Sequence, residues 1–273
     1  MKGMVFAGCS FTWGHGLWYY SELENMPYGE QHLHLFINKS SYSNIKDVNR
    51  FPRLVSKHFN TYEVVKRFTA GSEDTSFQFL KQIFDINEGE NSPTLSIEKY
   101  NFNEIEYLIF QTSSPDRNDF KIEIDGEIKS FNCNDLRRNK KIDLLYKNGI
   151  KDFEDFYELL VKQCFDNIKS NLEFYESKGI KCFLLCWTED YLPHIINDKW
   201  VNDRFIPLEY GNKSYDCINH LFKEYQNLII INDKEFFGEN TPKDEHPSKK
   251  CHQIIAESII KKIEQYEKIN QLA

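Results

Sequence analysis

The chain of 273 residues lacks the features of several large classes of binding protein. No run is rich in Lys and Arg, and a net charge of −8 with a pI near 5.6 disfavours binding to a phosphate backbone, which needs a basic surface. There is no Gly-Lys-Ser/Thr phosphate loop, and Gly14-x-Gly16 lacks the third glycine of a dinucleotide fingerprint. We therefore expect neither nucleic acid as a partner nor a nucleotide cofactor.

Long apolar runs are missing as well. No stretch is long enough to cross a membrane, and the first apolar run ends at Gly8, too short for a signal peptide. The cysteines are odd in number and lie mostly in apolar periodic segments, which is typical of reduced core residues; they are Cys9, Cys133, Cys164, Cys182, Cys186, Cys217 and Cys251. These observations predict a cytoplasmic protein without a membrane span.

A metal-binding pattern is also missing. His15, His32 and His34 lie in or next to an irregular segment that offers no frame of Cys or carboxylate ligands, so we expect them to be solvated and predict no metal. His252 has the right phase neither for catalysis nor for the apolar stripe of its segment, and we expect it at the surface.

Strand-like and helical stretches alternate along the chain. Strands are expected at about 3–8, 61–68, 104–112, 181–187 and 227–232, and helices at 74–87, 152–177, 213–225 and 249–269. This alternation predicts one α/β domain over residues 1–273, a three-layer α/β/α sandwich around a mostly parallel five-stranded sheet. In such a fold, sites form beyond the carboxyl ends of the strands.

Two stretches interrupt the alternation. Residues 18–50 are rich in Tyr, Asn, Ser and His without a clean period, and they could form a lid. Within a second insertion at about 115–150, residues 120–131 alternate around Asp125-Gly126, which predicts a β-hairpin. Insertions at this edge of an α/β protein shape substrate access, but surface decoration or an oligomer contact remains equally open.

Ser10 follows the short apolar run that begins at Val5. Gly8, Gly14 and Gly16 bracket it and permit a sharp turn with close backbone approach. A hydroxyl at a strand-to-helix turn is exposed where backbone N–H groups point at the atom it attacks, so Ser10 is a candidate nucleophile. A β-turn that happens to contain serine is the alternative.

Asp244 and His246 stand just before the last predicted helix. Pro247 favours an extended backbone at His246, and in an extended backbone residues two apart project to the same side. Asp244 can then reach one imidazole nitrogen, the arrangement of an acid that orients a base. The alternative is a helix start in which Asp244, His246 and Ser248 are cap candidates.

Together these segments resemble the SGNH hydrolase superfamily, also called GDSL-type esterases, which has a flavodoxin-like fold. In that family the nucleophilic Ser follows the first strand, and the Asp and His precede the last helix. Thr69–Asp74, TAGSED, is similar to the second block of the family, which implies that the N–H of Gly71 joins that of Ser10 in the oxyanion hole.

The chain departs from the family at two places. The third-block Asn is absent after the predicted strand, so the resemblance implies Thr112, Ser113 or Gln111 as the replacement donor, or none. The commoner family acid lies three residues before the histidine, where this chain has Lys243. The two-residue spacing of Asp244 also occurs among relatives that acetylate or deacetylate polysaccharides.

The resemblance implies a metal-independent serine hydrolase without a cofactor. It would remove or transfer a small acyl group, above all an acetyl group on a carbohydrate or similar small substrate, through an acyl-enzyme at Ser10. His246 would be the base and Asp244 would hold its tautomer. The alternative is a weak or inactive module of this fold whose aromatic segment 13–20 grips a glycan or a protein partner. Cys9, beside Ser10, is expected to point into the fold.

Overall fold

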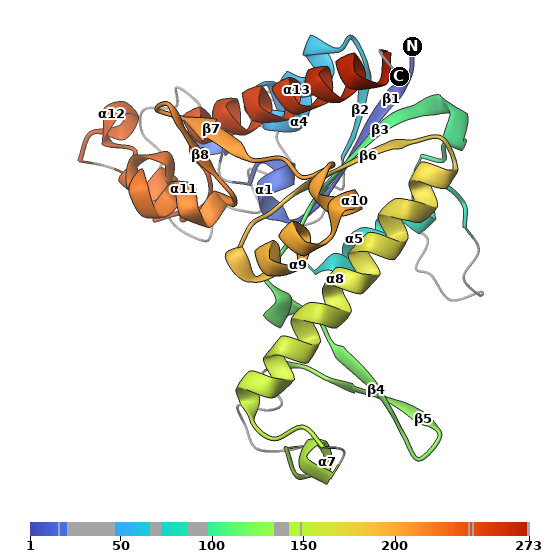
Figure 1. Cartoon of the computed structure of the whole chain (residues 1–273). Coiled ribbons are helices and arrows are strands. Elements are labelled where there is room, and N and C mark those ends of the chain that lie inside the picture. Colours follow the sequence, from blue (N-terminus) through green and yellow to red (C-terminus); the bar gives the residue numbers. More distant parts are fainter. Residues whose placement is uncertain are drawn as a thin grey trace.

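The computed structural model describes residues 1–15, 17–20, 47–65, 72–86, 98–133, 142–147, 149–239, 241 and 243–271. At its centre lies a sheet of four strands in the order β2-β1-β3-β6, and all three pairings are parallel (Figure 1). The strands are β1 Gly3–Ala7, β2 Tyr62–Val65, β3 Ile105–Gln111 and β6 Lys181–Leu185. The predicted α/β class and parallel sheet are confirmed.

Helices cover both faces of this sheet. Successive residues of a strand point to opposite faces, so Met4 and Phe6 pack into one hydrophobic cluster while Val5 and Ala7 pack into another. The first cluster includes residues of α4 (Phe51–His58) and α13 (Lys249–Gln271), and the second includes residues of α5 (Glu73–Ile83) and α8 (Phe153–Ser177). Figure 1 shows α4 and α13 on one side of the strands and α5 and α8 on the other, which is compatible with the expected sandwich.

The predicted helices at 74–87, 152–177 and 249–269 are confirmed by α5, α8 and α13. The side chain of Ser72 accepts the N–H of Thr75 in a capping box, and Asp152 accepts the N–H of Asp155. Among the described residues, no helix combines the length and the apolar character that crossing a bilayer requires.

The strand expected over 227–232 is absent, so the described sheet has four strands rather than five. This apolar run instead forms two 3-10 turns, η6 Gln226–Leu228 and η7 Ile230–Asn232. Its N–H groups bond to the segment that precedes α13, Ile230 to the carbonyl of His246 at 3.0 Å and Ile231 to that of Asp244 at 2.8 Å. The apolar pattern predicted the burial of this run correctly, but its backbone hydrogen bonds join it to a loop and not to the sheet.

The predicted hairpin is confirmed as β4 Phe120–Ile124 and β5 Glu127–Phe131. Asp125 and Gly126 have φ angles of 55° and 79°, as a tight hairpin turn with two left-handed residues requires. The hairpin projects from the body of the molecule beside α8 (Figure 1), and the next described element along the chain is α7 Ile142–Lys147. The helix expected at 213–225 begins only at Ile218, because the earlier residues form a second, shorter hairpin.

The remaining described elements are short. They are α1 Ser10–Trp13, η1 Leu17–Tyr20, η3 Phe102–Glu104, η4 Pro115–Arg117, η5 Glu189–Tyr191, α9 Leu192–Asn197, α10 Lys199–Asn202, β7 Leu208–Tyr210, β8 Lys213–Tyr215, α11 Ile218–Glu224 and α12 Lys234–Phe237. Of the proposed lid over 18–50, residues 21–46 lie outside the described residues.

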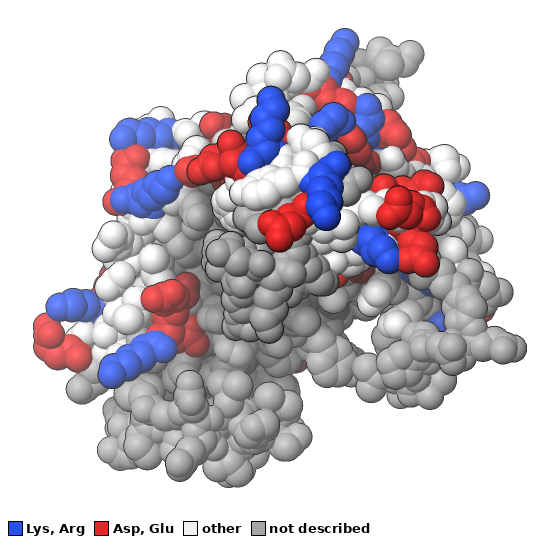
Figure 2. Space-filling view, turned by 90° about the horizontal axis from the view of Figure 1, so that it is seen from below, with Lys and Arg blue, Asp and Glu red and all other residues white. Residues whose placement is uncertain are grey.

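Lys and Arg lie among Asp and Glu over the described part of the face in Figure 2.

His252 is fully buried, so the expectation that it lies at the surface is wrong. Its ring stacks on Phe51 with centroids 5.7 Å apart, and its Nδ1 accepts the N–H of Phe51 at 3.3 Å. The N-cap residue of α4, Arg50, makes no side-chain cap bond, so His252 satisfies a donor in the first turn of that helix. The spacing of apolar residues along α13 could not predict this hydrogen bond of His252, because its partner lies on α4.

Burial, with the charges of His246 and Arg50, lowers the pKa of His252 to about 3. In the unfolded chain the pKa of a histidine is about 6.5, so between the two pKa values only the unfolded chain binds this proton. The free energy of unfolding must therefore fall as the pH drops through that window. We expect the wild type to lose more melting temperature between about pH 7 and pH 5 than His252→Asn, which keeps an acceptor near the Nδ1 position. The matched control is His58→Asn, at an exposed histidine; equal pH slopes for wild type and His252→Asn would contradict the prediction.

Candidate active site

Ser10 lies directly beyond the carboxyl end of β1, as the first residue of α1. The turn that presents it depends on two glycines. A Cβ on Gly8 would lie 2.2 Å from Thr12 Oγ1 and 2.9 Å from Gln111 Cβ, so no side chain fits there. Gly14 ends α1 with a φ of 80°, a conformation that glycine adopts without strain.

The structure brings the three predicted catalytic side chains together. His246 Nε2 lies 2.9 Å from Ser10 Oγ, although 236 positions separate the two residues. On the other side of the ring, His246 Nδ1 lies 2.7 Å from Asp244 Oδ1, which also accepts the backbone N–H of His246 at 2.8 Å. A continuous path of hydrogen bonds therefore runs from a buried carboxylate through an imidazole to a serine hydroxyl.

Asp244 is almost fully buried, and burial by itself would raise the pKa of its carboxyl. The hydrogen bonds and charge of His246, together with the charge of His15, outweigh burial and leave this pKa below its ordinary value. Asp244 is thus ionised at neutral pH and favours the tautomer with a proton on Nδ1 of His246. In that tautomer Nε2 is free to accept the proton of Ser10.

The loop that carries Asp244 and His246 is held by the apolar run 227–232. The N–H groups of Ile230 and Ile231 bond to its carbonyls, and the N–H of Ser248 bonds to the carbonyl of Leu228 at 2.7 Å. These backbone bonds set the extended conformation that Asp244 and His246 need. Sequence reasoning assigned this run to the sheet and so missed its contribution to the site.

Aromatic rings stand beside the imidazole. Phe11 lies edge-on to His246 at 5.1 Å between centroids and to Trp187 at 4.0 Å. Trp187, which the sequence did not single out, comes two residues after β6, at the edge where sites form in parallel sheets. The expected role of the 13–20 segment in stacking on a sugar remains a prediction, since the side chains of Trp13, Trp18 and Tyr19 are not described.

His15 is the one histidine of the three weighed as metal ligands that the structure describes. Its ring centroid lies 4.3 Å from that of His246, and donor atoms of His15, Asp244 and His246 all lie within 4.8 Å of one another. These three residues could hold a metal ion, as could Glu189, Cys217 and His220. At the first group, an ion bound to His246 would displace its hydrogen bond to Asp244 or to Ser10.

Gln111, a candidate for the missing third-block donor, spans the serine turn. Its Oε1 accepts the hydroxyl of Thr12 at 2.6 Å, and its Nε2 donates to Cys9 Sγ at 3.1 Å. Cys9 is buried, as expected. The amide therefore holds Cys9, which directly precedes Ser10, and Thr12, which lies two residues after it.

The polar groups of Thr112 and Ser113 also have partners. The N–H of Thr112 donates to the carbonyl of Leu185 at 2.9 Å, and its Oγ1 accepts the N–H of Trp187 at 3.1 Å. Ser113 donates its N–H and its hydroxyl to Glu73 at 2.9 and 2.8 Å. Ser113, or the backbone N–H of Thr112, could donate directly only by giving up these bonds, whereas the hydroxyl of Thr112 accepts the N–H of Trp187 and still has its own proton to donate. Gly71, the other expected donor, lies outside the described residues.

The chain was compared with protein-family models, with curated proteins and with solved structures, and none of the three comparisons found a match.

Proposed function

We propose that the chain is a serine hydrolase of the SGNH type that acts on esters. The observation that carries this proposal is the Ser10–His246–Asp244 path of hydrogen bonds, assembled from opposite ends of the chain beyond the carboxyl end of a parallel strand. A histidine placed between a serine hydroxyl and a buried carboxylate is the geometry of an activated nucleophile.

In the proposed reaction Ser10 Oγ attacks the ester carbonyl while its proton moves to His246 Nε2. The tetrahedral intermediate collapses, the C–O bond to the alcohol breaks, and His246 returns the proton to the leaving alkoxide. Water, or the hydroxyl of an acceptor, then attacks the acyl-enzyme while its proton moves to His246 Nε2. The bond between the acyl carbon and Ser10 Oγ breaks, and His246 returns the proton to Ser10. The N–H groups of Ser10 and Gly71 are the proposed oxyanion donors.

The proposed substrate carries a small acyl group, with an acetylated carbohydrate as the first candidate. Phe11 packs edge-on against His246 and also against Trp187, and these two aromatic rings would provide an apolar wall against an acyl methyl or a sugar face. The single parallel bridge between Leu184 and Phe205 supports the finer fold, because it places a short extended segment where a fifth strand would extend the sheet beyond β6. A cytoplasmic location belongs to this proposal, in which the seven buried thiols stay reduced.

Labelling with a fluorophosphonate probe tests this function, because only an activated serine reacts. We expect one label, located at Ser10 by peptide mass spectrometry, and its loss in His246→Ala. Ser177→Ala, at an exposed serine on α8, is the matched control and should label like the wild type. A folded wild type that does not label at Ser10 would instead favour a binding module of the same fold.

A further inference from the structure

Glu73, the first residue of α5, carries a buried carboxylate outside the proposed triad. Its Oε1 accepts the N–H of Ser113 at 2.9 Å and the hydroxyl of Tyr191 at 3.0 Å. Its Oε2 accepts the hydroxyl of Ser113 at 2.8 Å and the side-chain amide of Asn118. In addition, the backbone N–H of Glu73 donates to Oδ1 of Asn118 at 3.0 Å.

A carboxylate that is 2% exposed carries a large desolvation cost unless hydrogen bonds replace its water. Among the described residues, every partner of Glu73 is a neutral donor, and both oxygens are bonded twice. Burial, and then the charge of Glu73, holds the pKa of Tyr191 well above its ordinary value, so that hydroxyl stays protonated and donates. Such a fully bonded group has little freedom to move.

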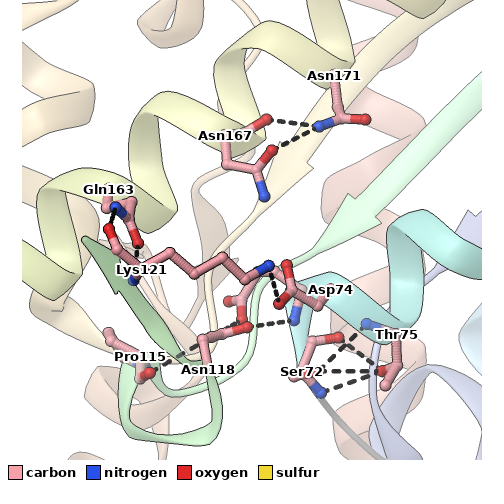
Figure 3. Close-up of polar contacts among 10 residues, drawn as sticks. Ser72, Asp74, Thr75, Pro115, Asn118, Lys121, Gln163, Asn167 and Asn171 are labelled. Atoms are coloured by element: carbon pink, nitrogen blue, oxygen red, sulfur yellow. Dashed lines mark hydrogen bonds and ion pairs between the residues drawn. The ribbon is translucent and has the colours of Figure 1, made fainter. Parts of the chain in front are cut away.

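The bonds of Glu73 join two segments that lie far apart in the sequence. Glu73 follows Gly71 and Ser72, while Ser113 and Asn118 belong to the connection between β3 and β4. Figure 3 shows Asn118 of this connection against the first turn of α5, next to Ser72 and Asp74. The first segment follows Gly71, a proposed oxyanion donor that itself lies outside the described residues. The second follows Gln111, whose side-chain amide bonds to Cys9 next to Ser10.

We infer that Glu73 is a positioning residue that cross-links these two segments and so sets the geometry of the oxyanion side of the site. The inference rests on the proposed function. Donors aimed at a developing charge act strongly only when they are held in place before the reaction. In this inference Glu73 does not touch the substrate. It acts through the backbone of the two segments that its hydrogen bonds join.

The test uses Glu73→Gln, which keeps the shape of the side chain but turns an amide NH₂ toward groups that themselves donate. We expect kcat for a short-chain ester to fall by roughly 10- to 100-fold with KM nearly unchanged, the size of loss that small misplacements cause. Inhibition by a trifluoromethyl ketone, which forms a tetrahedral adduct with Ser10 and places an oxyanion in the hole, should weaken by the same factor. A role confined to stability would not move that affinity.

The matched control is Lys121→Gln. It removes the partly exposed ion pair between Lys121 Nζ and Asp74, 3.5 Å apart, which joins the same turn of α5 to β4 without involving Glu73 (Figure 3). We expect its kcat and its ketone affinity to equal those of the wild type. If Glu73→Gln fails to fold, Tyr191→Phe tests the inference in its place, because it removes one donor to Oε1 of Glu73. We expect it to lower kcat and ketone affinity together, by a smaller factor than the one expected for Glu73→Gln.

The outcomes separate this inference from the proposed function. A wild type that neither labels at Ser10 nor binds the ketone would overturn the function and the inference with it. If the wild type is active and Glu73→Gln keeps its kcat and ketone affinity, only the inference is overturned. If Tyr191→Phe alone folds, the same result in that variant has the same meaning. A fall in melting temperature without a fall in ketone affinity would do the same, since it would assign Glu73 to stability.

Discussion

Ser10→Ala is expected to lower the hydrolysis of a short-chain ester such as 4-nitrophenyl acetate by roughly 10⁴-fold or more, because removing a nucleophile leaves only binding and oxyanion stabilisation. The melting temperature should barely change. Ser10 is 9% exposed, so the expectation of an exposed hydroxyl at this turn is wrong. The lost hydroxyl makes a 2.9 Å contact with His246, however, and the side chain of His246 is 24% exposed, so water can reach the imidazole and the cost stays below about 1 kcal/mol. Initial rates and thermal melts on the same preparations measure both effects.

Cys9→Ala is the companion variant, because the neighbouring thiol is the other nucleophile at this turn. We expect it to remain active, with at most a moderate loss from the broken contact to Gln111. An active Ser10→Ala with an inactive Cys9→Ala would assign the chemistry to the thiol. A large drop in melting temperature in Ser10→Ala would instead show that the serine is structural.

Asp244→Asn should lower kcat by about 10²- to 10⁴-fold without unfolding the chain. The carboxylate accepts the backbone N–H and the Nδ1–H of His246, and its charge stabilises the imidazolium that forms during attack. An asparagine has no charge, and its NH₂ group can face Nδ1 and favour the wrong tautomer. Steady-state kinetics should give losses of similar order for Asp244→Asn and His246→Ala, as expected of groups that act as a unit.

Lys243→Ala is the control for this assignment. Lys243 occupies the position of the commoner family acid, but its side chain is exposed while that of Asp244 is buried against the imidazole. We expect Lys243→Ala to be fully active. If Asp244→Asn kept wild-type rates and lost only about 1 kcal/mol of stability, Asp244 would be a helix-cap residue and the site a Ser-His pair.

Local patterns predicted the parts of this molecule that depend on neighbours in the chain. The apolar runs at β1, β3 and β6 have the length and flanking turns of buried parallel strands. The apolar residues of α8 recur about every four positions and so mark one face of the helix. Asp125-Gly126 predicted a hairpin because few residues adopt positive φ at two successive positions. The backbone preference that Pro247 imposes on His246 was likewise enough to predict that Asp244 and the imidazole share one side.

Periodicity does not specify which surface an apolar residue will meet. Residues 227–232 have the composition of a buried strand, and Leu228 and Ile230 are buried. The N–H groups of Ile230 and Ile231, however, bond to the loop of Asp244 and His246 and not to the sheet. His252 shows the same limit, because its partner is the first turn of α4. The polarity of Glu73 likewise does not indicate that its carboxylate is buried, because its four donor groups come from the connection between β3 and β4 and from Tyr191.

The sequence by itself therefore determined the α/β class, the main strands and helices, and the residues expected to form the Ser10–His246–Asp244 group. Only the tertiary structure decided that the fifth predicted strand supports the loop of Asp244 and His246, that Trp187 packs against Phe11 next to the imidazole's own contact with Phe11, and that Glu73 bonds to the connection between β3 and β4. The physical reason is the separation along the chain of the residues that interact. Turn conformation, capping and periodicity depend on residues a few positions apart, whereas a buried polar group needs hydrogen-bond donors that only the folded chain brings together.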